Sequence, residues 1–134
     1  MTIVVGYVPK PEGRAALRRA AEEALGRRER LVVVSSVPDT PGDLAPQGDR
    51  EELATVGEGL RAAGVEHEVR ALVRGQDASE ELIAIAEEVN ADMIVIGLRR
   101  RTPVGKLILG SNAQRILLDA PCPVLAVKAG DEDR

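Results

Sequence analysis

Three short, almost uninterrupted runs of Val, Ile and Leu constrain the fold of this chain most strongly. They occupy Thr2–Tyr7, Leu31–Val37 and Met93–Leu98. Continuous apolar runs of this length are typical of parallel strands that helices cover on both faces. Segments with apolar residues at helical spacing separate these runs, beginning with the one after Pro11. We therefore predict an α/β fold in three layers, in which an open parallel sheet lies between two layers of helices.

Two further strands are predicted at the edges of this sheet. In His67–Leu72, charged residues alternate with Val69 and Ala71, and this alternation predicts a strand with one face in water. Pro123–Val127 follows Pro121, and proline is tolerated at strand ends and sheet edges because it cannot donate a hydrogen bond. The sheet is therefore expected to have five strands, with the third and the fifth outermost.

Four helices are predicted between the strands. They begin at or near Pro11, Asp49, Asp77 and Ser111. Gly26 is expected at the C-terminal cap of the first helix, and Leu117 on the buried face of the fourth. No linker is long enough to separate two domains, so we predict one domain over residues 1–130 and a frayed tail at 131–134.

Composition and charge exclude several kinds of function. Tyr7 is the only aromatic residue among 134, so the chain has no platform on which the bases of single-stranded nucleic acid could stack. A net charge of -4 provides no general attraction to nucleic acid or to anionic membranes. No apolar run approaches the roughly 18 to 20 residues of a membrane span, and the first strand begins too early for a signal peptide. We therefore expect a cytoplasmic protein that binds neither nucleic acid nor membrane.

Few side chains are available for catalysis or for metal binding. Cys122 is the only cysteine and His67 the only histidine, so the sequence contains neither a disulfide pair nor a Cys/His zinc cluster. We interpret Cys122 as a small buried residue and His67 as a surface residue. No metal site and no catalytic residue is predicted.

The segment after the fourth predicted strand carries the strongest indication of a ligand site. Ligands of open α/β sheets bind at the carboxyl ends of the strands, near the point where the strand order reverses. Residues 97–112 combine three glycines, three arginines and a lysine, and they lead into a helix at Gly110, Ser111 and Asn112. Free N–H groups at a helix start bind anions, so we predict a phosphate site. The alternative is an ordinary turn followed by a helix cap.

This segment differs from two common nucleotide-binding motifs. A P-loop that ended at Gly105 and Lys106 would need a glycine where Arg100 stands, and a serine or threonine where Leu107 stands. The dinucleotide pattern Gly-x-Gly-x-x-Gly does not follow the first strand. Neither fold-defining motif is present.

Over its whole length the chain resembles a universal stress protein. The similar segments are Ile3–Gly6, Pro11–Leu17, Gly97–Ser111 and Ala120–Val127. In nucleotide-binding members of that family, a pattern of Gly, two residues, Gly, nine residues and then Gly-Ser or Gly-Thr surrounds the phosphates of ATP. Gly97, Gly110 and Ser111 match this pattern in register, whereas Arg100 occupies the position of the second glycine.

The resemblance implies a fold similar to that of the adenine nucleotide alpha hydrolases, with strand order 3-2-1-4-5. It also implies ATP or AMP as the ligand, with Mg²⁺ accompanying ATP. The residues predicted to bind nucleotide or phosphate are Gly97, Arg99, Arg100, Gly110, Ser111 and Asn112. The residues predicted to line the site from the ends of the first two strands are Tyr7, Val8, Pro9 and Val37.

Two departures from the family pattern bear on nucleotide affinity. Val8 stands where binding members usually have an acid near the ribose and adenine, and a valine side chain cannot accept a hydrogen bond. Arg100 can either fill the space that a glycine leaves for phosphate or add a charged fork that holds it, and the sequence leaves both open. We expect weaker binding than in members with the complete motif, and binding that depends on phosphate more than on adenine or ribose.

The leading functional hypothesis is a small cytoplasmic stress-response module of the universal stress family that responds to nucleotide. The alternative is a member that no longer binds nucleotide and acts only through unidentified protein partners. A slow ATPase or a self-phosphorylating protein is a third hypothesis, against which stands the absence of an evident general base. A homodimer through Val124–Val127 is also expected, because pairing covers an apolar edge strand and the resemblance implies the same contact.

Overall fold

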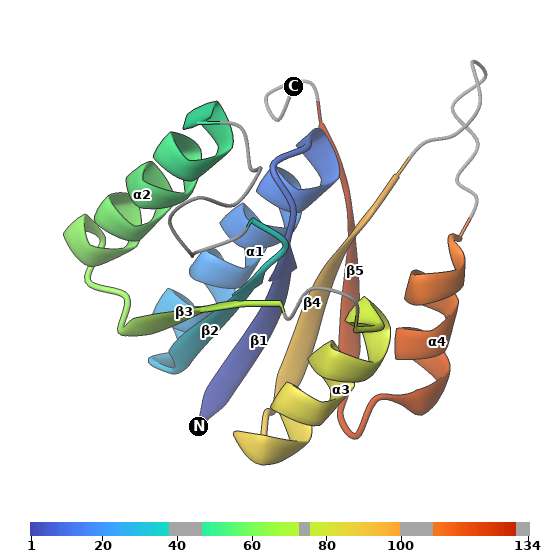
Figure 1. Cartoon of the computed structure of the whole chain (residues 1–134). Coiled ribbons are helices and arrows are strands. Elements are labelled where there is room, and N and C mark those ends of the chain that lie inside the picture. Colours follow the sequence, from blue (N-terminus) through green and yellow to red (C-terminus); the bar gives the residue numbers. More distant parts are fainter. Residues whose placement is uncertain (38–46, 73–75, 100–108, 131–134) are drawn as a thin grey trace.

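The computed structural model describes residues 1–37, 47–72, 76–99 and 109–130, which form a parallel sheet with helices on both faces (Figure 1). The strands are β1 (Thr2–Tyr7), β2 (Arg30–Ser35), β3 (His67–Ala71), β4 (Met93–Leu98) and β5 (Val124–Lys128). The helices are α1 (Pro11–Arg27), α2 (Gln47–Ala62), α3 (Ala78–Glu88) and α4 (Ser111–Asp119). The strand order is β3-β2-β1-β4-β5, which confirms the predicted fold class and topology. Arg100 and the predicted tail at 131–134 lie outside the described residues.

The two faces of the sheet bury separate apolar clusters. Successive side chains of a strand point to opposite faces, so the runs in β1, β2 and β4 supply both clusters. Ile3, Val5 and Val33 pack under α1 and α2, with none of their surface exposed. Val4 and Ile94, also fully buried, pack under α3 and α4. The prediction that these three strands are central and covered on both sides is confirmed.

The third strand lies at an edge, as predicted, but its exposed face is not the expected one. Val69 pairs in register with Val33, so it points toward the α2 side, and yet it is 40% exposed. Glu68 and Arg70 point toward the other face and are half-buried in an ion-pair network that includes Glu88 of α3. On the α2 side of this edge strand, the helix covers the apolar side chain of Val69 only in part. On the α3 side, Arg70 forms an ion pair with Glu88 of the helix.

Two details of the helices differ from the predictions. Helix α1 continues past Gly26 to Arg27, and its C-cap residue is Arg28, whose φ of 56° is left-handed and whose N–H donates to the carbonyl of Ala24. Leu117 is 41% exposed, because only the stripe of α4 that contains Ile116 packs against the sheet. In the ranges that the structure describes, no helix combines the length and the apolar character needed to cross a membrane.

Two carboxyl groups meet at the amino end of the sheet. Glu29 precedes β2 and Asp92 precedes β4, the two strands that flank β1. Glu29 Oε2 and Asp92 Oδ2 are buried and have no hydrogen-bond donor among the described residues. Two carboxyl groups can share a hydrogen bond only when one of them carries a proton. This hydrogen bond with Asp92, together with desolvation, raises the pKa of Glu29.

We expect the free energy of unfolding to decrease as the pH rises through the raised pKa of Glu29. The folded chain binds this proton more tightly than the unfolded chain, so the stabilisation is complete below the ordinary pKa of glutamate and is lost above the raised one. In Glu29→Gln, an amide N–H can donate to Asp92 at every pH. The variant should therefore be more stable than the wild type at about pH 8, and its stability should vary less between about pH 5 and about pH 8.

Urea denaturation at the two pH values measures both effects. Glu22→Gln, at an exposed position of α1, removes the same charge without touching the pair and serves as the control. Equal pH dependence in the wild type and in Glu29→Gln would contradict the shared proton.

Candidate functional site

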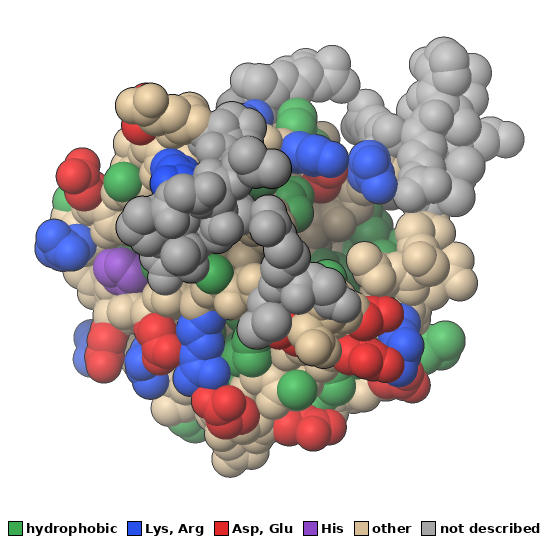
Figure 2. Space-filling model, in the orientation of Figure 1, with side chains coloured by type: hydrophobic (Ala, Val, Ile, Leu, Met, Phe, Trp, Pro, Cys, Tyr) green, Lys and Arg blue, Asp and Glu red, His purple; other side chains and the backbone are tan. Residues whose placement is uncertain are grey.

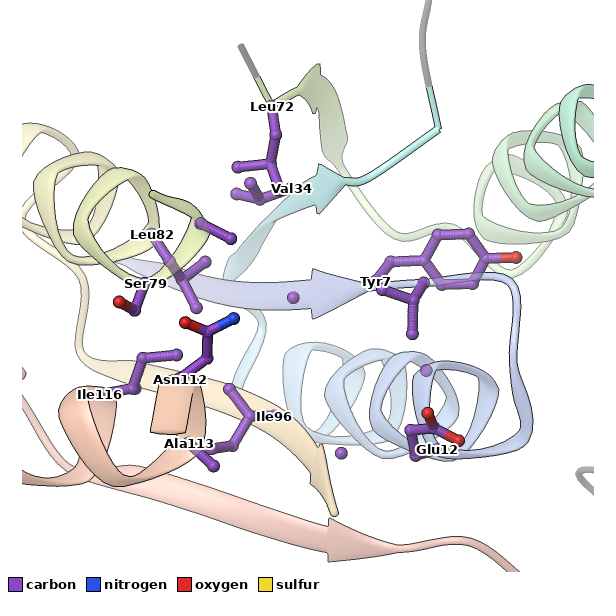
Figure 3. Close-up of a pocket in the computed structure, with 15 residues that line it drawn as sticks. Tyr7, Glu12, Val34, Leu72, Ser79, Leu82, Ile96, Asn112, Ala113 and Ile116 are labelled. Carbon is purple, nitrogen blue, oxygen red and sulfur yellow. The ribbon is translucent and has the colours of Figure 1, made fainter. Parts of the chain in front are cut away.

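A crevice opens at the carboxyl ends of β1 and β4, where the strand order reverses. Its inner part is a hollow of about 170 Å³ between the strand ends, α3 and α4, which we call the apolar hollow (Figure 3). The apolar side chains that line it include those of Val8, Val34, Leu72, Ala78, Leu82, Ile96, Ala113 and Ile116. The carboxyl ends of β1 to β4, together with α3 and α4, thus enclose a surface suited to a flat apolar group.

A second hollow of about 220 Å³ adjoins the first, and we call it the polar hollow. Arg99 and Gly110 line only this second hollow. Described residues that line both are Val8, Glu12, Gly97, Asn112 and Ala113, so the two hollows are parts of one crevice. In Figure 2 the crevice appears as a depression with basic and acidic side chains at its upper rim.

Two glycines bring the first turn of α1 against the strand ends. A Cβ atom at Gly13 would lie 1.9 Å from the carbonyl oxygen of Val8, and one at Gly97 would lie 2.0 Å from that of Glu12. No other residue fits at either position without a shift of the backbone. Gly97 therefore has a packing reason to be glycine, independent of any phosphate.

The amino end of α4 carries the amide groups that sequence reasoning selected. Gly110 is the N-cap residue and has no side chain, so no side-chain oxygen caps the first turn. Asn112 projects into the crevice, as Figure 3 shows, whereas Ser111 is exposed and lines neither hollow. Within the described ranges no side chain caps the first N–H groups of α4, so they can bind water or an anion.

Helix α3 begins at the same crevice but caps itself. Asp77 accepts hydrogen bonds from the backbone N–H of Ser79 (2.9 Å), from the Ser79 hydroxyl (2.5 Å) and from the N–H of Glu80 (3.2 Å). These bonds, that of the Ser79 hydroxyl first, lower the pKa of Asp77. Because the N–H groups of Ser79 and Glu80 are already satisfied, α3 offers the crevice a buried hydroxyl and apolar surface rather than an anion site.

Tyr7 lines the crevice with the part of the residue nearest the backbone, not with its ring hydroxyl. Its ring extends away from the apolar hollow, as Figure 3 shows. The Tyr7 hydroxyl donates to Glu52 of α2, which in turn accepts from Arg14 Nε at 2.9 Å. Burial, with the Glu52 carboxylate beside it, raises the pKa of the Tyr7 hydroxyl. This network connects α1 and α2 on the opposite face of the sheet from the apolar hollow.

The remaining predicted lining residues lie outside both hollows. Val37 is 3% exposed and belongs to the apolar cluster under α1 and α2. The carbonyl of Pro9 accepts a hydrogen bond from Arg14 at 3.4 Å, which helps to hold the turn after β1. In the part of the chain that the structure describes, no group of three or more His, Cys, Asp or Glu side chains could hold a metal ion.

Comparison with known proteins identifies the family. The sequence matches the model of the universal stress protein family over residues 1–128. A universal stress protein of Mycolicibacterium smegmatis is 46% identical over 129 residues, which cover 94% of this chain and 96% of the relative. The chain belongs to the universal stress protein family.

Two solved structures of similar proteins agree in fold. A universal stress protein from Archaeoglobus fulgidus is 41% identical, with a TM-score of 0.75 over 96% of this chain and 98% of that one. Another structure of the universal stress protein from that organism, in complex with dAMP, is 36% identical, with a TM-score of 0.69 over 96% of this chain and 98% of that one.

For this universal stress protein, sequence reasoning selected part of the crevice and missed part. The structure brings Gly97, Arg99, Gly110 and Asn112 together around the polar hollow. Glu12 was missed, because an acid in the first turn of a helix is ordinarily explained by the helix dipole. The apolar lining from β2, α3 and α4 was also missed, since the same residues read as ordinary core. The short spacing between Val8 and Glu12, across the turn that follows β1, was the one available signal.

We expect Gly97→Ala to destabilise this universal stress protein by about 1 to 3 kcal/mol, the usual cost of forcing an extra group into a packed contact. The added methyl would collide with the Glu12 carbonyl. Gly26→Ala is the matched control, because a Cβ atom there meets nothing within 4 Å and the helix should gain up to about 1 kcal/mol. Urea denaturation measures both changes. A Gly97→Ala variant as stable as the wild type would show that α1 can move away from β4.

Proposed function

We propose that this universal stress protein binds an adenine nucleotide, AMP or ATP, in the crevice at the ends of β1 and β4. The observation that carries the proposal is that an apolar hollow and a polar hollow adjoin in one crevice. Arg99 and the amino end of α4 line the polar hollow. The base would occupy the apolar hollow and the phosphates the polar one. The dAMP complex of the 36% identical relative supports this ligand class.

The phosphate end of the site combines two kinds of attraction. Uncapped N–H groups of α4 and the positive end of its dipole favour an anion at Gly110 and Asn112. Arg99 is exposed at the rim of the same hollow and adds a charged donor. Mg²⁺ is proposed only as the companion of the phosphates of ATP. Ser111 lines neither hollow, so it is proposed as a phosphate contact only if its side chain turns toward the ligand.

The cellular role that we propose is a cytoplasmic stress-response module of one domain, residues 1–130. Its state would be set by whether the crevice holds nucleotide. The described part of the site offers binding groups rather than a pair of residues arranged for hydrolysis, so we propose binding and not turnover.

We expect Arg99→Ala to weaken AMP binding by about three- to tenfold, the loss of one exposed charged contact, and to leave adenosine binding unchanged. AMP affinity of the wild type should also fall as salt rises, because exposed charge contacts are screened. Isothermal titration calorimetry of AMP, ATP and adenosine at two salt concentrations measures these effects.

Arg27→Ala is the control, since Arg27 is exposed at the far end of α1 and pairs with Glu23. Tight AMP binding that is insensitive to both salt and Arg99→Ala would contradict the phosphate assignment. Absence of AMP and ATP binding in the wild type would contradict the proposed function itself.

We also propose that two copies associate through β5. This strand is an edge of the sheet, and its apolar residues from Val124 to Val127 are only partly buried in one chain. An apolar edge strand with unpaired backbone groups tends to pair with another copy. Leu117 and Leu118, on the helix that leads into β5, are 41% and 83% exposed and add apolar surface near the start of the strand.

We expect light scattering to give twice the chain mass of 14.3 kDa at tens of micromolar protein. Leu125→Glu and Ala126→Asp, on opposite faces of β5, should each yield the monomer, and circular dichroism should verify that each variant remains folded. Val69→Glu, on the opposite edge strand, should remain dimeric. A monomeric wild type, or dissociation by Val69→Glu alone, would contradict the β5 interface.

A further inference from the structure

Glu12 holds a position in the crevice that its place in the helix does not explain. Among the described residues, it has the only charged side chain that lines both the apolar and the polar hollow. It therefore lies where a ligand that spans the two hollows must pass from one to the other. Figure 3 shows its carboxylate on the α1 side of the crevice, with Asn112 on the α4 side.

The backbone of Glu12 is held firmly in this position. Its carbonyl oxygen lies 2.0 Å and its Cβ atom 3.0 Å from where a Cβ atom of Gly97 would be. The turn before it is closed by a hydrogen bond of 2.8 Å from the N–H of Lys10 to the carbonyl of Val8, and Pro11 begins the helix. The side chain of Glu12 thus starts from a rigid point directly over the end of β4.

The carboxylate of Glu12 is available to a ligand. The described residues provide it with no hydrogen bond and no ion pair, although Arg99 and Asn112 line the same polar hollow. A carboxylate only accepts hydrogen bonds, through two oxygens, and it repels phosphate. The chemical group that suits this position is therefore one with two adjacent donors and no negative charge.

We propose that Glu12 recognises the ribose of the bound nucleotide by accepting hydrogen bonds from its 2′ and 3′ hydroxyl groups. This inference rests on the proposed function, because a base in the apolar hollow and a phosphate in the polar hollow place the sugar between them. It makes the crevice selective for ribonucleotides over nucleotides that lack these hydroxyls. A ligand without them would leave the carboxylate beside it without a donor, which costs binding free energy.

A role in helix stability alone makes a different prediction. An acid in the first turn of α1 favours the helix dipole, and its removal would lower the stability of the chain without changing the preference among nucleotides. The discriminating measurement is therefore the ratio of two affinities in one variant, which a uniform loss of folded protein leaves unchanged.

The experiment measures the binding of AMP, dAMP and 2′,3′-dideoxy-AMP to the full chain by calorimetry. The wild type should bind AMP about tenfold more tightly than dideoxy-AMP, and dAMP should lie between the two. A difference in affinity of about tenfold is what a partly exposed hydrogen bond to a charged group contributes. Glu12→Ala should lose this tenfold preference for AMP and bind dideoxy-AMP no more weakly than the wild type. Glu12→Gln, which keeps one acceptor oxygen, should retain part of the preference.

The control is Glu22→Ala, which removes the same charge from an exposed position of α1 and should keep the full preference. AMP binding that Glu12→Ala leaves unchanged or strengthens would overturn the inference and show that the carboxylate opposes the phosphate instead. Equal losses for AMP and dideoxy-AMP would also overturn it. Absence of AMP binding in the wild type would overturn the proposed function first, so the two failures are distinguishable.

Discussion

The contact between the first turn of α1 and the ends of β1 and β4 determines the shape of the crevice. It is a contact of backbone with backbone, and it exists because Gly13 and Gly97 have no Cβ atom to hold the helix away. The turn after β1 is consequently short, and it carries Val8 and Glu12 to the junction of the two hollows. A wider turn would leave the apolar hollow open and the proposed sugar position without a wall.

This contact also changes the interpretation of the glycine motif. Gly97 matches the phosphate-binding pattern of the family, but the structure requires glycine there for the packing of α1 against β4. Gly110 has φ -69° and ψ 164°, a conformation that any residue can adopt, so its contribution is the absence of a capping side chain. By contrast, the Asp77 side chain occupies the N–H groups of Ser79 and Glu80 at the start of α3, whereas Gly110 supplies no such side chain to α4.

The sequence alone determined the architecture, because the signals for it are local. Runs of apolar residues and their periods identify β1, β2 and β4 as central strands, and β3 and β5 as edges. The carboxyl ends of parallel strands share one edge of the sheet, so the position of Gly97–Asn112 directly after a central strand was enough to predict a ligand site there. Local patterns also carry errors, as for Leu117 and Val69, since the exposure of a residue depends on how far a neighbouring helix extends over it.

Only the tertiary structure decided which side chains share the crevice and what they have to offer. Glu12, Leu72 and Ser79 come from three segments whose sequences read as helix start, strand end and helix cap, and nothing local indicates that they surround one cavity. Tyr7 reads as a crevice residue, but its ring turns to the other face and is held by Glu52. The physical reason is that such contacts depend on how closely each helix settles on the sheet. For α1, the distance from the sheet is set by Gly13 and Gly97, which lie against the backbone of Val8 and Glu12. Only the three-dimensional structure shows this contact.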